Sequence, residues 1–79
     1  MIVYYFGAEG CPQCRAMKPM VDKWCRAKGV TMVDVDVEED DSLTASYNIR
    51  NIPTAIVKDG ETVVARLTGI DKWKEYAAE

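Results

Sequence analysis

The pattern of apolar residues over the first half of the chain constrains its fold more than any other feature. Residues 2–6 form a continuous apolar and aromatic run, which is typical of a strand buried on both faces of a sheet. Apolar side chains then recur at three- and four-residue spacing between positions 17 and 25, which indicates a helix with one apolar face. We expect this helix to begin near Cys11, with Pro12 at its first helical position, and to end before a capping Gly29.

Residues 30–37 follow the helix and alternate between valine and aspartate in their second half, which predicts a strand with Val33, Val35 and Val37 on one face and Asp34 and Asp36 on the other. A strand, a helix and a strand within this length make a βαβ unit. The two strands should therefore be parallel, with a right-handed crossover.

The second half of the chain predicts two further strands between two short helices. Residues 42–47 favour a short helix that Asp41 or Ser42 could cap. Residues 54–58 and 61–67 favour strands joined by Asp59-Gly60, a pair that favours a type I′ turn with positive φ at both residues. A final short helix carries Trp73, Tyr76 and Ala77 on one face. The order β-α-β-α-β-β-α predicts an α/β fold with a four-stranded mixed sheet flanked by helices.

Length and charge restrict the classes of protein that remain. With 79 residues, we expect one domain over residues 1–79. The net charge is −3, from 10 basic and 13 acidic side chains, so the sequence has no electrostatic footprint for nucleic acid. No apolar stretch approaches the roughly 18 residues of a membrane span, and the start of the chain lacks the basic region of a signal peptide.

The cysteine count points to a reducing compartment. Three cysteines are an odd number, whereas a secreted disulfide framework favours an even one, and there is no histidine. A Cys-x-x-Cys pair with one extra thiol suits a cytoplasmic protein whose cysteines act in catalysis or bind metal.

Cys11-Pro12-Gln13-Cys14 is the motif that carries chemistry, since two cysteines across the first turn of a helix can close a small disulfide. The unsatisfied N–H groups and the dipole of the helix N-terminus favour the thiolate form of Cys11. We expect Cys11 to be the attacking nucleophile, and Cys14, one turn deeper, to be the resolving thiol.

A metal site is the alternative interpretation of this spacing. A tetrahedral zinc site needs four ligands, and Cys25 lies on the order of 16 Å along the helix from Cys14, at ~1.5 Å per residue. We therefore expect no metal in one chain and expect Cys25 to be a small core residue beside Trp24.

Two segments of the chain resemble thioredoxins. Residues 8–14, with Pro19 five residues after the second cysteine, are similar to the thioredoxin active-site helix, and residues 47–54 are similar to the segment that ends in Ile-Pro-Thr. Asp59-Gly60 and Thr68-Gly69 match the expected hairpin and the glycine after the last strand. The resemblance covers nearly the whole chain and implies a thioredoxin-like fold.

The resemblance also implies a substrate groove around the disulfide. Pro53 would be a cis proline opposite Cys11, and the backbone at Ile52 would pair with an extended substrate. Thr54 and Gly69 would line the same groove. The active-site loop would consist of Gly10, Pro12 and Gln13.

The chain departs from thioredoxins at several positions. The first strand and helix of longer thioredoxins are absent, which leaves the minimal core of glutaredoxins, and Cys-Pro-x-Cys is closer to the glutaredoxin motif. Gly10 stands where thioredoxins have a tryptophan. Tyr5 stands where they have a buried aspartate that helps to deprotonate the resolving cysteine, so water or Glu9 would have to take that role here.

Three hypotheses follow. In the first, the chain is a thiol–disulfide oxidoreductase that acts as a monomer, without a cofactor, on protein disulfides and receives electrons from a flavin-dependent thioredoxin reductase. In the second, it is a glutaredoxin with glutathione as co-substrate and electron donor, for which Arg15, Lys18 and Arg50 are the candidate cations. In the third, it is a non-enzymatic binding module.

Overall fold

The computed structural model describes residues 1–79 and contains four strands and three helices. In chain order these are β1 (Ile2–Gly7), α1 (Pro12–Lys28), β2 (Thr31–Asp36), α2 (Asp41–Ser46), β3 (Thr54–Asp59), β4 (Thr62–Thr68) and α3 (Ile70–Ala77). The predicted order of elements is confirmed, and the boundaries predicted for the elements from β1 to β4 lie within a residue or two of those in the structure.

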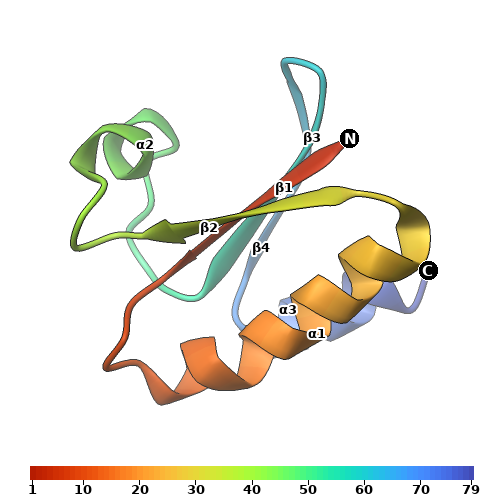
Figure 1. Cartoon of the computed structure of the whole chain (residues 1–79), viewed down its shortest axis with the longest axis horizontal. Helices are drawn as coiled ribbons and strands as arrows, with labels where there is room; N and C mark the ends of the chain where they lie inside the picture. The colour runs from red at the N-terminus through yellow and green to blue at the C-terminus, as the bar shows by residue number, and fades with distance from the viewer.

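The four strands form one mixed sheet in the order β2-β1-β3-β4. Strand β1 runs parallel to β2 and antiparallel to β3, and β3 and β4 form an antiparallel hairpin. Helices α1 and α3 cover one face of the sheet, and α2 lies on the other side (Figure 1). The predicted fold class, a four-stranded mixed sheet flanked by helices, is therefore confirmed.

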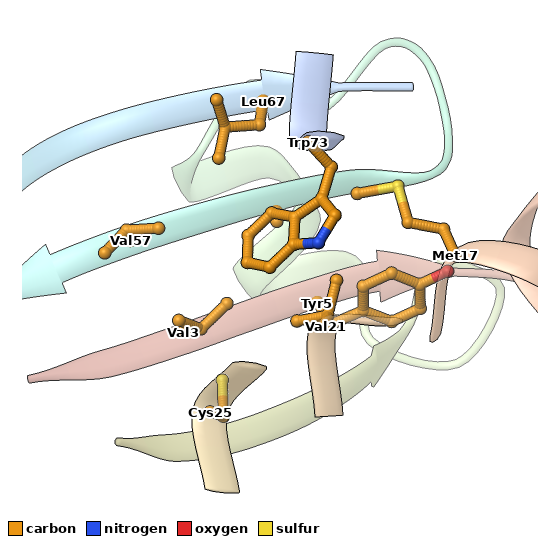
Figure 2. Packing of buried hydrophobic residues seen from close by; sticks show 9 residues of the cluster. Val3, Tyr5, Met17, Val21, Cys25, Val57, Leu67 and Trp73 are labelled. Atoms are coloured by element: carbon orange, nitrogen blue, oxygen red, sulfur yellow. The ribbon is translucent and has the colours of Figure 1, made fainter. Parts of the chain in front are cut away.

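Strand β1 is buried on both faces because its alternating side chains enter two separate clusters. Val3 and Tyr5 pack under α1 and α3 with Met17, Val21 and Trp73, as Figure 2 shows. On the other face, Phe6 packs with Val35 and Ile56, and residues of α2 close this smaller cluster. The continuous apolar run of β1 is thus the sequence signature of a strand between two layers of helix.

The cysteine pair Cys11 and Cys14 lies at the N-terminus of helix α1, and Gly29 caps its C-terminus. Gly29 has a φ of 68°, the left-handed conformation that lets its backbone N–H reach back to the last turn. Near this end of α1, the ring of Trp24 lies 5.4 Å from that of Trp73 in α3, in an edge-to-face arrangement. This contact fixes α1 against α3 at the end far from the cysteines. None of the helices is both long and apolar enough to cross a membrane.

Two local predictions are wrong. The N-cap of α2 is Asp40, whose Oδ1 accepts a hydrogen bond from the Leu43 N–H at 3.0 Å, and not Asp41 or Ser42. In the hairpin, Asp59 pairs with Thr62, so Gly60 and Glu61 are the central residues of the turn. Only Gly60 has a positive φ, which is the pattern of φ signs of a type II′ turn rather than the expected type I′.

Candidate functional site

Cys11 and Cys14 meet at the junction of β1 and α1. They form a disulfide, with their Cα atoms 5.2 Å apart. Cys11 is the N-cap of α1, with extended backbone dihedral angles, and its Sγ accepts a hydrogen bond from the Cys14 N–H at 3.2 Å. Pro12 occupies the first helical position, where its missing N–H has no cost. The sequence therefore places the sulfur of Cys11 at the positive end of the helix dipole.

The two sulfurs differ in access to solvent. Cys14 is 4% exposed, whereas Cys11 is only partly buried and its neighbours Gly10, Pro12 and Gln13 are exposed or at the surface. An incoming disulfide can therefore approach Cys11 but not Cys14. The N-terminal N–H groups of α1 stabilise a thiolate at Cys11, because they are donors without partners inside the helix.

The second sequence-predicted segment is the loop before β3. The Ile52–Pro53 peptide bond is cis, the geometry that the resemblance implied. The Pro53 carbonyl accepts a hydrogen bond from the Gly69 N–H at 2.9 Å, which ties this loop to the end of β4. A shallow hollow beside them is lined by Gln13 of α1 together with Thr68, Gly69, Ile70 and Asp71. The structure thus brings Gln13, Gly69 and the Pro53 loop to one side of the molecule.

Thr54 is 1% exposed and, like Pro53, is buried. Its hydroxyl donates to the Asn51 carbonyl at 2.6 Å and lies 3.1 Å from the hydroxyl of Thr68. The side chain of Thr54 is therefore used to hold the loop before β3 in place. Ile52 is half-buried against the Phe6 cluster.

Tyr5 lies directly beneath Cys14. Its hydroxyl donates a hydrogen bond of 2.5 Å to the backbone carbonyl of Cys14, and the residue is 1% exposed. Burial, and to a lesser extent the negative charge of Asp34, raises the pKa of Tyr5 to about 12. Tyr5 is therefore a neutral donor at physiological pH.

A cavity opens beside Tyr5, between α1 and the ends of β1 and β2. Its volume is about 250 Å³, and its walls include Tyr5, Gly7 and Cys14 with five charged residues, namely Glu9, Arg15, Lys18, Asp34 and Asp36. Lys18 and Asp34 form an ion pair in which both side chains are about half exposed. A polar cavity therefore reaches the otherwise buried Cys14.

Sequence reasoning missed both the Tyr5 hydrogen bond and this cavity. The alternation of Asp34 and Asp36 does put both carboxylates on one face of β2, but it does not say which helix covers that face. The parallel register, which pairs Tyr5 with Asp34 and Gly7 with Asp36, supplies that information.

Cys25, the third cysteine, is free and 1% exposed in the core. Burial, with a smaller contribution from Asp22, raises the pKa of the Cys25 thiol. It packs with Val3 and Val21 (Figure 2), which agrees with its predicted role as a core residue.

Comparison with known sequences agrees with this geometry. The family model described as thioredoxin matches residues 1–78. Thioredoxin from Rhodospirillum rubrum is 31% identical over 74 residues, which cover 90% of this chain and 71% of that protein. Thioredoxin C-2 from Corynebacterium nephridii is 38% identical over 76 residues, 92% of this chain and 69% of that one. Other relatives are longer, and the chain spans 35% of Thioredoxin-2 from Pyricularia oryzae.

Comparison with solved structures also finds thioredoxins. Thioredoxin-2 of a malaria parasite superposes with a TM-score of 0.85 at 26% identity, covering 98% of this chain and 77% of that one. Thioredoxin 1 from Thermosipho africanus superposes with a TM-score of 0.84 over 99% of this chain and 96% of that one. At 24% identity, this second likeness shows the fold alone.

Proposed function

This chain belongs to the thioredoxin family and is a thiol–disulfide oxidoreductase, and from that premise we propose that it reduces disulfide bonds of other proteins through Cys11 and Cys14. The observation that carries the proposal is the unequal exposure of the two sulfurs at the N-terminus of α1. The accessible sulfur, Cys11, is the nucleophile, and the 4% exposed sulfur, Cys14, is the resolving thiol.

Two exchange steps complete the reduction. In the first, the Cys11 thiolate attacks one sulfur of the substrate, forms a mixed disulfide and displaces the other substrate sulfur as a thiolate that takes up a proton. In the second, Cys14 loses its proton and attacks the Sγ of Cys11, which releases the remaining substrate sulfur. The enzyme gives up two electrons and the proton of Cys14 and is left as the Cys11–Cys14 disulfide, and the second proton that the two substrate thiolates take up comes from solvent.

In this proposal the groove for the substrate lies between Gln13 on one side and, on the other, Gly69 with the Pro53 loop that is hydrogen-bonded to it. Gly69 has a φ of 90° and no side chain, and the space at its Cβ position is open, so an extended segment could approach the backbone here. The backbone of Ile52 is the pairing edge in this proposal, since strand addition supplies affinity without selecting a sequence. Gln13 forms the opposite rim.

A flavin-dependent thioredoxin reductase is the electron donor that we propose, because the relatives are thioredoxins rather than glutaredoxins. The odd number of cysteines, one Cys-x-x-Cys pair with one extra thiol, supports a reducing compartment such as the cytoplasm, where the protein would act as a monomer without a resident cofactor. Equilibration with glutathione tests the donor. A reduction potential near −270 mV, the thioredoxin value, supports the proposal, and a value near −200 mV with a glutathione adduct on Cys11 opposes it.

The assignment of roles is tested by trapping. Cys14→Ser should accumulate a mixed disulfide with native insulin, whose disulfides are intact. Cys11→Ser should form no mixed disulfide and should show no insulin reduction above the dithiothreitol background. The matched control is Cys25→Ala, which removes the third thiol and should keep full turnover. Full multiple turnover by Cys14→Ser would refute the resolving role.

A further inference from the structure

Resolution of the mixed disulfide requires a proton to leave a thiol that is 4% exposed. Tyr5 is the nearest polar side chain beneath Cys14, but its hydroxyl is a donor to the Cys14 carbonyl and stays protonated at neutral pH. Figure 2 shows its oxygen at the edge of the apolar cluster. Tyr5 therefore positions Cys14 without accepting its proton.

Gly7 explains how Cys14 is reached from the cavity. A Cβ built on Gly7 would lie 3.3 Å from the Sγ of Cys14 and 3.3 Å from its Cβ. Any side chain at position 7 would therefore occupy the space against this sulfur. Because Gly7 has none, the cavity extends to Cys14, and its volume of about 250 Å³ has room for several water molecules at ~30 Å³ each.

Five charged groups face this cavity from the three elements around it. Glu9 lies on the loop after β1, Arg15 and Lys18 on α1, and Asp34 and Asp36 on β2. Three of the five are carboxylates, and only a carboxylate among them accepts a proton at neutral pH.

Asp34 is distinguished from the other carboxylates by its contacts. It pairs in register with Tyr5, the residue that holds the Cys14 carbonyl, and its Oδ2 is bound by Lys18, one helical turn after Cys14. Asp36 instead uses its Oδ1 to accept the Glu38 N–H at 2.9 Å, a contact that directs it into the following loop. Glu9 is exposed on the loop after β1 and makes no side-chain hydrogen bond or ion pair. Asp34 is thus the carboxylate fixed toward the turn of α1 that carries Cys14.

We infer that Asp34 is the proton acceptor for Cys14 and acts through water in the cavity beneath Gly7. As Cys14 attacks Cys11, its proton passes through water to the Asp34 carboxylate, which then releases it to solvent. Lys18 holds the carboxylate in place. The inference rests on the proposed roles of Cys11 and Cys14.

A single-turnover reaction of the reduced protein with dithiobis(nitrobenzoate) separates the two steps. The first coloured thiol is released by attack of Cys11, at a rate proportional to reagent concentration, and the second by resolution, at a rate independent of it. In Asp34→Asn, the first phase should keep its rate. The second should slow about tenfold at pH 7, and by about tenfold more for each lower pH unit, because the thiolate fraction then limits it.

Rescue distinguishes proton transfer from a structural effect. Formate is small enough for the cavity and should accelerate the second phase of Asp34→Asn in proportion to its concentration, without changing the wild type. Asp34→Glu should keep the wild-type pH profile. The matched control is Asp36→Asn, which removes a carboxylate from the same strand and cavity and should leave the second phase unchanged.

Three results would overturn the inference. Asp34→Asn could keep the wild-type rate and pH profile of resolution. The second phase could slow in Asp36→Asn and not in Asp34→Asn, which would make Asp36 the acceptor of the Cys14 proton. A wild-type protein that releases only one coloured thiol would show that Cys14 does not resolve, and the proposed function would fail together with the inference.

Discussion

Replacement of Tyr5 by phenylalanine tests the contact beneath Cys14. The change removes one buried hydroxyl, which donates to the Cys14 carbonyl at 2.5 Å, and keeps the ring that packs under α1. A buried hydrogen bond between neutral groups contributes about 1 kcal/mol to the free energy of unfolding. Tyr5→Phe should therefore be less stable than the wild type by about 1 kcal/mol near neutral pH.

The difference in free energy of unfolding between the wild type and Tyr5→Phe should change sign at alkaline pH. The pKa of Tyr5 is raised from 10.0 to about 12 in the folded protein, so the native state holds this proton more tightly than the unfolded chain does. The associated stability, about 3 kcal/mol at ~1.36 kcal/mol per pKa unit, is fully present below about pH 10 and is lost as the pH rises through about 12. Phenylalanine has no proton to lose, so the variant should become the more stable protein above about pH 11.

Urea unfolding of the oxidised wild type and variant between about pH 8 and pH 12 measures this difference. Other titrating groups are shared by the two proteins and cancel when one free energy of unfolding is subtracted from the other. A difference that stays constant over this range would refute the reasoning, because it would mean that the Tyr5 hydroxyl is not held in its neutral form by the fold.

Two stability predictions concern the ends of helices. Gly29→Ala should lower the free energy of unfolding by about 1–2 kcal/mol, because the φ of 68° at Gly29 disfavours a Cβ. Gly10→Ala should leave the free energy of unfolding unchanged, because Gly10 does not have a positive φ and the space at its Cβ position is open. Asp40→Ala should cost about 1 kcal/mol through loss of its bond to the Leu43 N–H, whereas Asp41→Ala should change stability by only a few tenths. Urea titration measures all four variants, and equal losses within either pair would contradict the assigned backbone strain or cap.

Features of the fold that depend on local pattern were predictable from the sequence. The apolar run of β1, the spacing of apolar residues along α1 and the alternation in β2 each reflect how one element is buried, and together they gave the sheet and the helices on both faces. The position of Cys11 at a helix N-terminus was predictable for the same reason, since Pro12 and the preceding glycine mark the boundary.

Features that depend on register or on distant contacts were not predictable. Asp40, Asp41 and Ser42 are all good cap residues, and only the backbone decides which one faces the Leu43 N–H. The centre of the hairpin turn depends on the pairing register of β3 and β4, which shifts between Val57 and Lys58, and neither this register nor its irregularity has a signature in one sequence.

In the candidate site, too, only the features that depend on local sequence were predictable. The cysteine pair was found from spacing, whereas the cavity depends on Gly7 meeting Cys14 and on Asp34 lying beside Tyr5. A glycine and an aspartate in a strand are unremarkable until the parallel pairing of β1 with β2 places them around one sulfur.

The central place of β1 also affects how the chain folds during its synthesis. Ile2 pairs with Thr31 on one side and with Lys58 on the other, so β1 leaves the ribosome well before either partner. Until β3 emerges, β1 has an unpaired edge and apolar side chains on both faces, the combination that invites pairing with other chains. The nascent protein is therefore exposed to aggregation through the edge of β1 until the hairpin of β3 and β4 has emerged and paired with it.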